Sequence, residues 1–117
     1  MTINKRGGAG VRTRGNSYER QLAREFRELG WTDCVTARAE SRNTDAKKVD
    51  LMNTTPFSVQ AKCKNNFGSP VNILSEMPKD SNYNVVFQKV VSKGEYVTMA
   101  KADFYELLKM LKKENII

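Results

Sequence analysis

Apolar and polar residues alternate strictly from Phe57 to Lys64. Successive side chains of a β-strand point to opposite faces, so this period of two predicts a strand over residues 57–64. Its apolar face holds Phe57, Val59, Ala61 and Cys63, and its polar face holds Ser58, Gln60, Lys62 and Lys64. Two shorter strands are predicted before it, at residues 34–39 and 49–52, and Asn53-Thr54-Thr55-Pro56 is typical of a hairpin turn.

A helical period precedes these strands. Four apolar residues recur at helical spacing: Tyr18, Leu22, Phe26 and Leu29. Asn16 has the character of an N-cap, Glu19 stands where a capping box places its acid, and Gly30 is a natural C-terminal stop. We therefore expect a helix over residues 16–29.

The remaining segments complete an α/β pattern. The polar residues 40–48 predict a loop, residues 71–77 a short helix, residues 83–91 and 96–100 two strands, and residues from 102 onward a last helix. The expected order is helix, three strands, helix, two strands, helix, which is an α/β fold with a mixed sheet flanked by helices. A chain of 117 residues has room for one modest core, so residues 16–117 are expected to form a single domain.

The charge of the chain favours a polyanionic partner. Twenty Lys and Arg residues stand against thirteen Asp and Glu residues, a formal net charge of +7. Residues 1–15 carry four basic residues, four glycines and no acid, and they predict a flexible basic arm. Two interpretations of this arm stay open: a tail that only aids solubility, and a segment that contacts nucleic acid.

The residue types that are absent exclude several classes of enzyme. Without histidine, the chain can be neither a Ser-His-Asp or Cys-His hydrolase nor a metallopeptidase with histidine ligands. Cys34 and Cys63 are too few for a structural zinc site, and two buried free thiols are favoured over a disulfide. No apolar run reaches the length of a membrane span and no secretory signal is evident, so an intracellular, cytoplasmic protein without a membrane partner is expected.

Three polar residues of the strand region point to metal chemistry when they are considered together. Asp50 lies between Val49 and Leu51, so it belongs to a strand, and the hairpin is expected to bring it beside Gln60 and Lys62. Carboxylate, amide and backbone carbonyl oxygens, such as the carbonyl of Ala61, suit Mg²⁺, and Mn²⁺ is expected to substitute for it. Each residue alone also has a structural interpretation, as part of a solvated strand face or as a cap.

The order Glu19, Asp50, Gln60-Ala61-Lys62 resembles the PD-(D/E)XK nuclease superfamily. More narrowly, Gly15-Asn16-Ser17-Tyr18-Glu19-Arg20, Gly30-Trp31, Arg38 and Ser41 resemble the opening of archaeal-type Holliday junction resolvases. The resemblance covers residues 12–64. It implies a restriction-endonuclease-like core and a Mg²⁺-dependent endonuclease that cuts branched DNA, most simply four-way junctions, as a homodimer.

The resemblance also implies roles for single residues. Asp50 would be the central metal ligand, Glu19 the ligand from the helix and Lys62 the catalytic lysine, with Gln60 in the place of the second strand acid. Val49 stands where the family name has proline. The surface expected to contact DNA comprises Arg12, Arg14, Arg20, Arg38, Ser41, Arg42, Lys47, Lys48 and Lys64.

Alternatives remain open at this point. The same fold could serve a restriction-type or repair-type endonuclease that cuts duplex DNA. It could also be a DNA-binding module without activity, because Gln60 is neutral where a nuclease usually has an acid. Asp45, in the polar loop, competes with Asp50 for the place of the central ligand; the apolar context of Asp50 favours Asp50.

Overall fold

The computed structural model describes residues 3–40 and 48–117 of the chain. Their helices and strands are, in chain order, α1 (Ile3–Leu29), β1 (Val35–Thr36), α2 (Ala37–Glu40), β2 (Leu51–Met52), β3 (Phe57–Lys64), α4 (Pro70–Ser75), β4 (Tyr83–Val90), β5 (Gly94–Met99) and α5 (Lys101–Lys113). The strand predicted over residues 57–64 is confirmed as β3. Among the described residues, the expected α/β order is confirmed, and they also contain the short helix α2.

The strands form a mixed sheet of three strands and a separate ladder of two. β3 and β4 are parallel, and β5 pairs with β4 in the antiparallel sense, which gives the order β3-β4-β5. β1 and β2 form the small antiparallel ladder. The backbone N–H of Asp50, just before β2, donates a hydrogen bond to the carbonyl of Val59 in β3 at 2.7 Å, so the ladder is attached to the free edge of β3.

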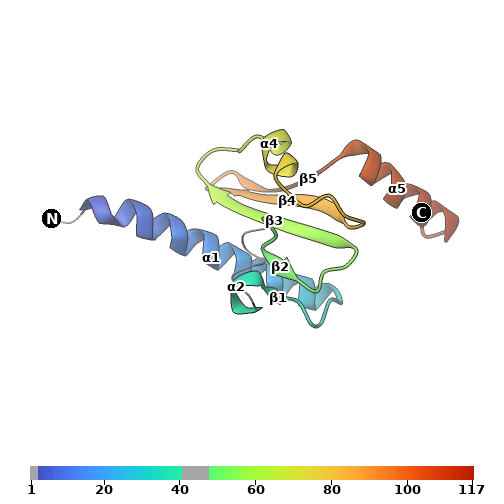
Figure 1. Cartoon of the computed structure of the whole chain (residues 1–117), viewed down its shortest axis with the longest axis horizontal. Coiled ribbons are helices and arrows are strands. Elements are labelled where there is room, and N and C mark those ends of the chain that lie inside the picture. The colour runs from blue at the N-terminus through green and yellow to red at the C-terminus, as the bar shows by residue number, and fades with distance from the viewer. Residues whose placement is uncertain (1–2, 41–47) are drawn as a thin grey trace.

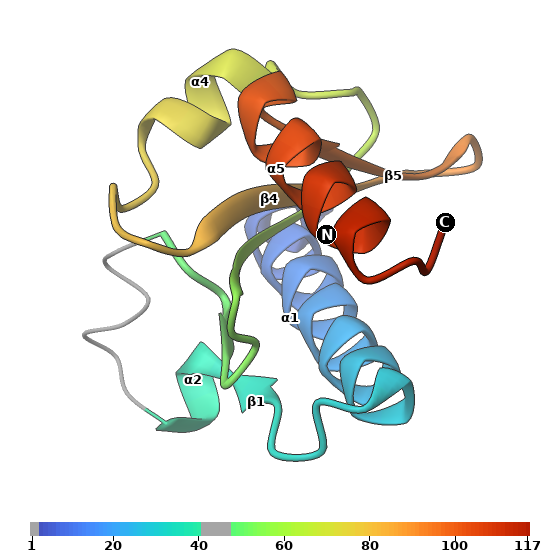
Figure 2. The same cartoon turned by 90° about the vertical axis from the view of Figure 1, so that its right-hand side faces the viewer.

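Helices cover both faces of the three-stranded sheet (Figures 1 and 2): α1 lies on one side and α4 on the other. The apolar face of β3 meets α1, as its alternation predicts. The core between them is formed chiefly by Tyr18, Leu22, Phe26, Val59, Ala61, Cys63 and Val85. This packing fixes the position of α1 relative to the free edge of β3.

Leu29 was expected on the buried face of the first helix, but 71% of it is exposed. The chain turns at Gly30, whose φ is 124°, and Trp31 then packs against Phe26 with 5.5 Å between the ring centroids. The indole therefore occupies the end of the core, and the last residue of α1 remains outside it.

The predicted start of the first helix is wrong, because α1 begins at Ile3 and not at Asn16. Residues 3–15 of the basic segment thus have helical backbone, and Figure 1 shows this part of α1 extending beyond the sheet. Once packing fixes the downstream turns, each residue added at the N-terminus gains a backbone hydrogen bond, which outweighs the cap preference of Asn16. Glu19 consequently lies inside the helix and is not part of a capping box.

The strand predicted over residues 34–39 is limited to β1, because helix α2 begins at Ala37. The hydroxyl of Thr36 accepts a hydrogen bond from the N–H of Ala39 at 3.3 Å, as an N-cap does. The sequence Ala-Arg-Ala-Glu that follows consists of good helix formers. Arg38 therefore lies on a helical turn and not in a strand or loop.

The other predicted elements shift by a few residues. The strand expected over 49–52 is limited to Leu51–Met52, and the short helix expected at 71–77 is Pro70–Ser75. Cys34 and Cys63 are both buried and free, which confirms the favoured prediction, and burial raises the pKa of the Cys34 thiol. No helix in residues 3–40 and 48–117 combines the length and the apolar character that a bilayer crossing requires.

Candidate active site

A cavity of about 260 Å³ lies between α1 and the free edge of β3. Its walls are formed by Gly15, Glu19, Arg38, Lys48, Asp50, Gln60, Ala61, Lys62, Cys63 and Lys64. All four residues predicted to be catalytic thus line one cavity, although they are up to 43 positions apart in the sequence (Glu19 to Lys62). The N–H of Ala37 donates to the carbonyl of Asp50 at 2.8 Å, so the start of α2 is attached to the same edge.

Asp50 is fixed at the edge of β3 by three hydrogen bonds. Its backbone N–H is bound to Val59, as described above. Its carboxylate oxygen Oδ2 accepts from the N–H of Ala61 at 2.7 Å and from Nε2 of Gln60 at 3.1 Å. Only 5% of the residue is exposed. The carboxylate is therefore held in one orientation, which is what a metal ligand needs.

Gln60 presents a buried oxygen to this site. Its Nε2 is used by Asp50, and its Oε1 is buried and has no hydrogen-bond partner among the described residues. Leaving a buried polar atom without a partner costs about 1–3 kcal/mol. An amide oxygen in this position is suited to accept a bond from a bound cation or from water.

The backbone of Ala61 faces the same edge. In a strand, the N–H and the C=O of one residue leave on the same side. Since the N–H of Ala61 donates to Asp50, its carbonyl is also directed to the side away from β4. The predicted role of Ala61 as a backbone ligand is compatible with this geometry.

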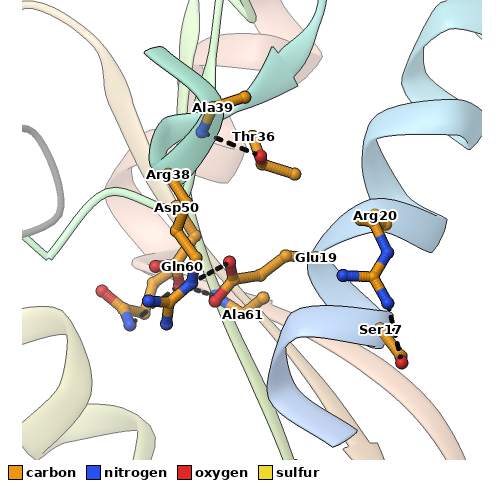
Figure 3. Close-up of polar contacts among 9 residues, drawn as sticks. All are labelled: Ser17, Glu19, Arg20, Thr36, Arg38, Ala39, Asp50, Gln60 and Ala61. Atoms are coloured by element: carbon orange, nitrogen blue, oxygen red, sulfur yellow. Dashed lines mark hydrogen bonds and ion pairs between the residues drawn. The ribbon is translucent and has the colours of Figure 1, made fainter. Parts of the chain in front are cut away.

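Glu19 enters the cavity from α1 and is paired with an arginine from α2. Its Oε1 lies 3.1 Å from Nε of Arg38. Glu19 is buried, with 4% of the residue exposed, whereas half of the Arg38 side chain is exposed. Figure 3 shows the two side chains pointing toward one another beside Asp50, Gln60 and Ala61. The buried carboxylate thus has a neutralising cation at the surface of the protein.

The oxygen atoms of this cluster fit a hard divalent cation. Two carboxylates, one unpaired amide oxygen and one carbonyl are the ligand types that Mg²⁺ prefers, with water completing the shell. Within the described part of the chain, no three His, Cys, Asp or Glu side chains gather to hold a metal ion. A metal bound here would accordingly depend on the mixed set Glu19, Asp50, Gln60 and Ala61.

Four cations line the same cavity: Arg38, Lys48, Lys62 and Lys64. Lys62 lies two positions beyond Gln60 on β3, so both side chains leave the strand on the same face. A phosphate that enters the cavity would meet these cations together with the oxygen cluster.

Other residues predicted to contact DNA lie elsewhere. Arg20 donates to the hydroxyl of Ser17 at 3.2 Å, on a part of α1 that faces away from the cluster (Figure 3). Arg14 lines a different groove, beside residues of β4 and the turn after it. Arg12 is a residue of α1. Ser41, Arg42 and Lys47 lie outside the described residues, as does Asp45.

Sequence reasoning missed two contacts of this site: the bond from Ala61 to Asp50, and the pairing of Arg38 with Glu19. Arg38 was expected near DNA but not on a metal ligand. The run of helix formers at 37–40 contained the relevant signal, since a helical turn here changes the direction of the arginine.

Comparison of the chain with protein-family models, with curated proteins and with solved structures finds no match.

Proposed function

We propose that this protein is an intracellular, metal-dependent endonuclease with a PD-(D/E)XK-type core, acting on branched DNA and most simply on Holliday junctions. The observation that carries the proposal is the meeting of Glu19, Asp50, Gln60 and Lys62 in one basic cavity. The oxygen of Gln60 is buried without a partner beside the Asp50 carboxylate, which is costly unless the site uses this oxygen.

In this proposal Glu19, Asp50, Gln60 and Ala61 would hold Mg²⁺, which would supply Lewis-acid chemistry for phosphodiester hydrolysis. Asp50 is oriented by Ala61 and Gln60, so its carboxylate needs no rearrangement before it binds. Lys62 brings a positive charge to the mouth of the site, where it offsets the negative charge that develops on the phosphate. Lys48 and Lys64 position the DNA backbone.

The choice of substrate is tested by comparing a synthetic four-way junction with its component duplexes at equal concentration. We expect cleavage of the junction and much slower cleavage of the duplexes. Junction binding should weaken steeply as salt rises, because phosphate contacts release counterions. Equal rates on junction and duplex would instead favour the restriction-type or repair-type alternative.

A two-fold symmetric substrate calls for two active sites, and we propose a homodimer formed through α5. This helix is amphipathic and contains no buried residue, and Phe104 and Met110 remain about half exposed. Figure 1 shows it projecting past the end of the sheet. Asp103 and Glu106 lie in its first half and three of its four lysines in its second half. Two antiparallel copies would thus oppose acids and bases along the apolar contact.

Replacing Phe104 by Glu is expected to make the protein monomeric. Loss of a buried aromatic contact of about 3 kcal/mol weakens association about a hundredfold, and the new charge adds to the loss. Sedimentation velocity measures the change. Leu29→Glu, at an exposed apolar residue of α1, is the control and should remain dimeric. A wild-type monomer, or a dimeric Phe104→Glu variant, would contradict an α5 interface.

One observation favours a second function. Gln60 is neutral, so the site has fewer negative charges than two strand acids would give it. A DNA-binding module without activity would have the same basic cavity. The response of the protein to Gln60→Glu separates the two functions.

A further inference from the structure

We propose that Arg38 controls access of the metal to the active site, by competing with it for Glu19 and by leaving Glu19 for a DNA phosphate. This inference rests on the proposed function and adds regulation to the same site. It assigns Arg38 as a positioning residue that couples DNA binding to metal binding.

The first step is the position of the ion pair. Oε1 of Glu19 lies 3.1 Å from Nε of Arg38, and the carboxylate is almost fully buried. Asp50 and Gln60 line the same cavity as this carboxylate, and Figure 3 shows their side chains beside Glu19. The guanidinium of Arg38 is therefore paired with a carboxylate that is a proposed ligand of the metal.

The second step is electrostatic. A divalent cation on Glu19 and a guanidinium on the same carboxylate would stand within a few ångströms of each other and repel. Because the Glu19 carboxylate is almost fully buried, this repulsion is screened less than between two exposed charges. Binding of one cation therefore weakens binding of the other.

Arg38 lies at the exposed end of this ion pair. Half of its side chain is exposed, and it stands on the short helix α2 at the rim of the cavity. The planar guanidinium binds phosphate in the same way as it binds carboxylate, with a fork of N–H donors. A DNA phosphate at the rim can thus draw Arg38 away from Glu19 without any change in the core.

These steps give a thermodynamic coupling. If DNA removes the competitor of the metal, then metal and DNA each raise the affinity of the protein for the other. The metal site would be filled mainly when DNA is in place. A merely structural ion pair, which holds α2 against α1, would produce no such coupling.

The test is a titration with Mn²⁺ in the absence of DNA, followed by the electron paramagnetic resonance signal of the free ion. Arg38→Gln and Arg38→Met remove the competing charge and should bind Mn²⁺ about fivefold more tightly than wild type, the scale of a partly exposed ion pair. Arg38→Lys retains a charge within reach of Glu19 and should bind close to wild type. Arg20→Gln is the control, because it removes an arginine charge from the residue next to Glu19 in the sequence. Among the described residues, Arg20 contacts Ser17 and not Glu19, so the Mn²⁺ affinity of this variant should equal that of wild type.

Thermal melting identifies the variants that are folded. One folded variant with an uncharged residue at position 38 is enough for the comparison with wild type. The inference is overturned if that variant binds Mn²⁺ no more tightly than wild type. Asp50→Asn, measured alongside, keeps the two proposals apart. If Asp50→Asn loses the ion while the Arg38 variants match wild type, the site is correct and the role of Arg38 is wrong. If Asp50→Asn binds as wild type does, or wild type binds no ion, the proposed active site fails and the inference with it.

Discussion

Replacing Asp50 by Asn is expected to reduce Mg²⁺-dependent cleavage of a four-way junction by about a hundredfold or more, the scale of losing charge stabilisation worth several kcal/mol. Asparagine preserves the size of the side chain, and its amide oxygen can still accept the bond from Ala61. The negative charge at the centre of the oxygen cluster is lost. Junction binding should persist, because it depends on the surrounding lysines and arginines.

Lys62→Met should show the same pattern, since it removes the charge next to the phosphate and retains the aliphatic stem. Rates of strand cleavage and electrophoretic binding assays separate the two properties. Asp80→Asn and Lys79→Met are matched controls: they remove the same charges from an exposed turn that does not line the cavity. Wild-type cleavage by both Asp50→Asn and Lys62→Met would show that the site has been misassigned.

The second large effect is expected from Gln60→Glu, which should tighten metal binding by on the order of tenfold, because affinity follows the number of charged ligands. Without metal, the variant should melt about 5 °C or more below wild type. The new carboxylate loses the hydrogen bond from Nε2 to Asp50 and places two buried negative charges side by side.

Melting curves with and without Mg²⁺ measure both changes at once, since a ligand bound only by the folded protein raises its stability. The control is Gln88→Glu, at another buried glutamine of the sheet, which binds Gly68 and is not part of the cavity. The Gln88→Glu variant should melt below wild type, and Mg²⁺ should not raise its melting temperature. If wild type does not cleave and Gln60→Glu does, the natural protein is a DNA-binding module. If Mg²⁺ does not restore Gln60→Glu, the oxygen of Gln60 is not part of a metal site.

Strand periodicity predicted the part of the site that depends on local structure. The alternation over residues 57–64 has one cause, the burial of Val59, Ala61 and Cys63 against α1, and this burial forces Gln60 and Lys62 to the other face. The hairpin turn at residues 53–56 likewise predicted that Asp50 lies beside β3, which the bond to Val59 confirms. The apolar neighbours of Asp50 predicted a strand residue, but β2 begins only at Leu51.

The parts that could not be predicted depend on competition between local preferences and packing. Asn16 and the residues after it are typical of a helix start. The helix α1 nevertheless continues through Asn16, because the later turns of α1 are packed in the core. Residues 34–39 are apolar enough for a strand, but the Thr36 cap and the helix formers after it make α2. This helical turn places Arg38 next to Glu19. The two residues are 19 positions apart, so no local sequence pattern predicts their contact.

We propose that the cluster of Glu19, Asp50, Gln60 and Lys62 is a metal-dependent nuclease site. Its most direct test is the cleavage of an end-labelled four-way junction by the wild-type protein with Mg²⁺ and with EDTA. We expect nicked products with Mg²⁺ and none with EDTA. Intact junction under both conditions, or equal cleavage in EDTA, would contradict it.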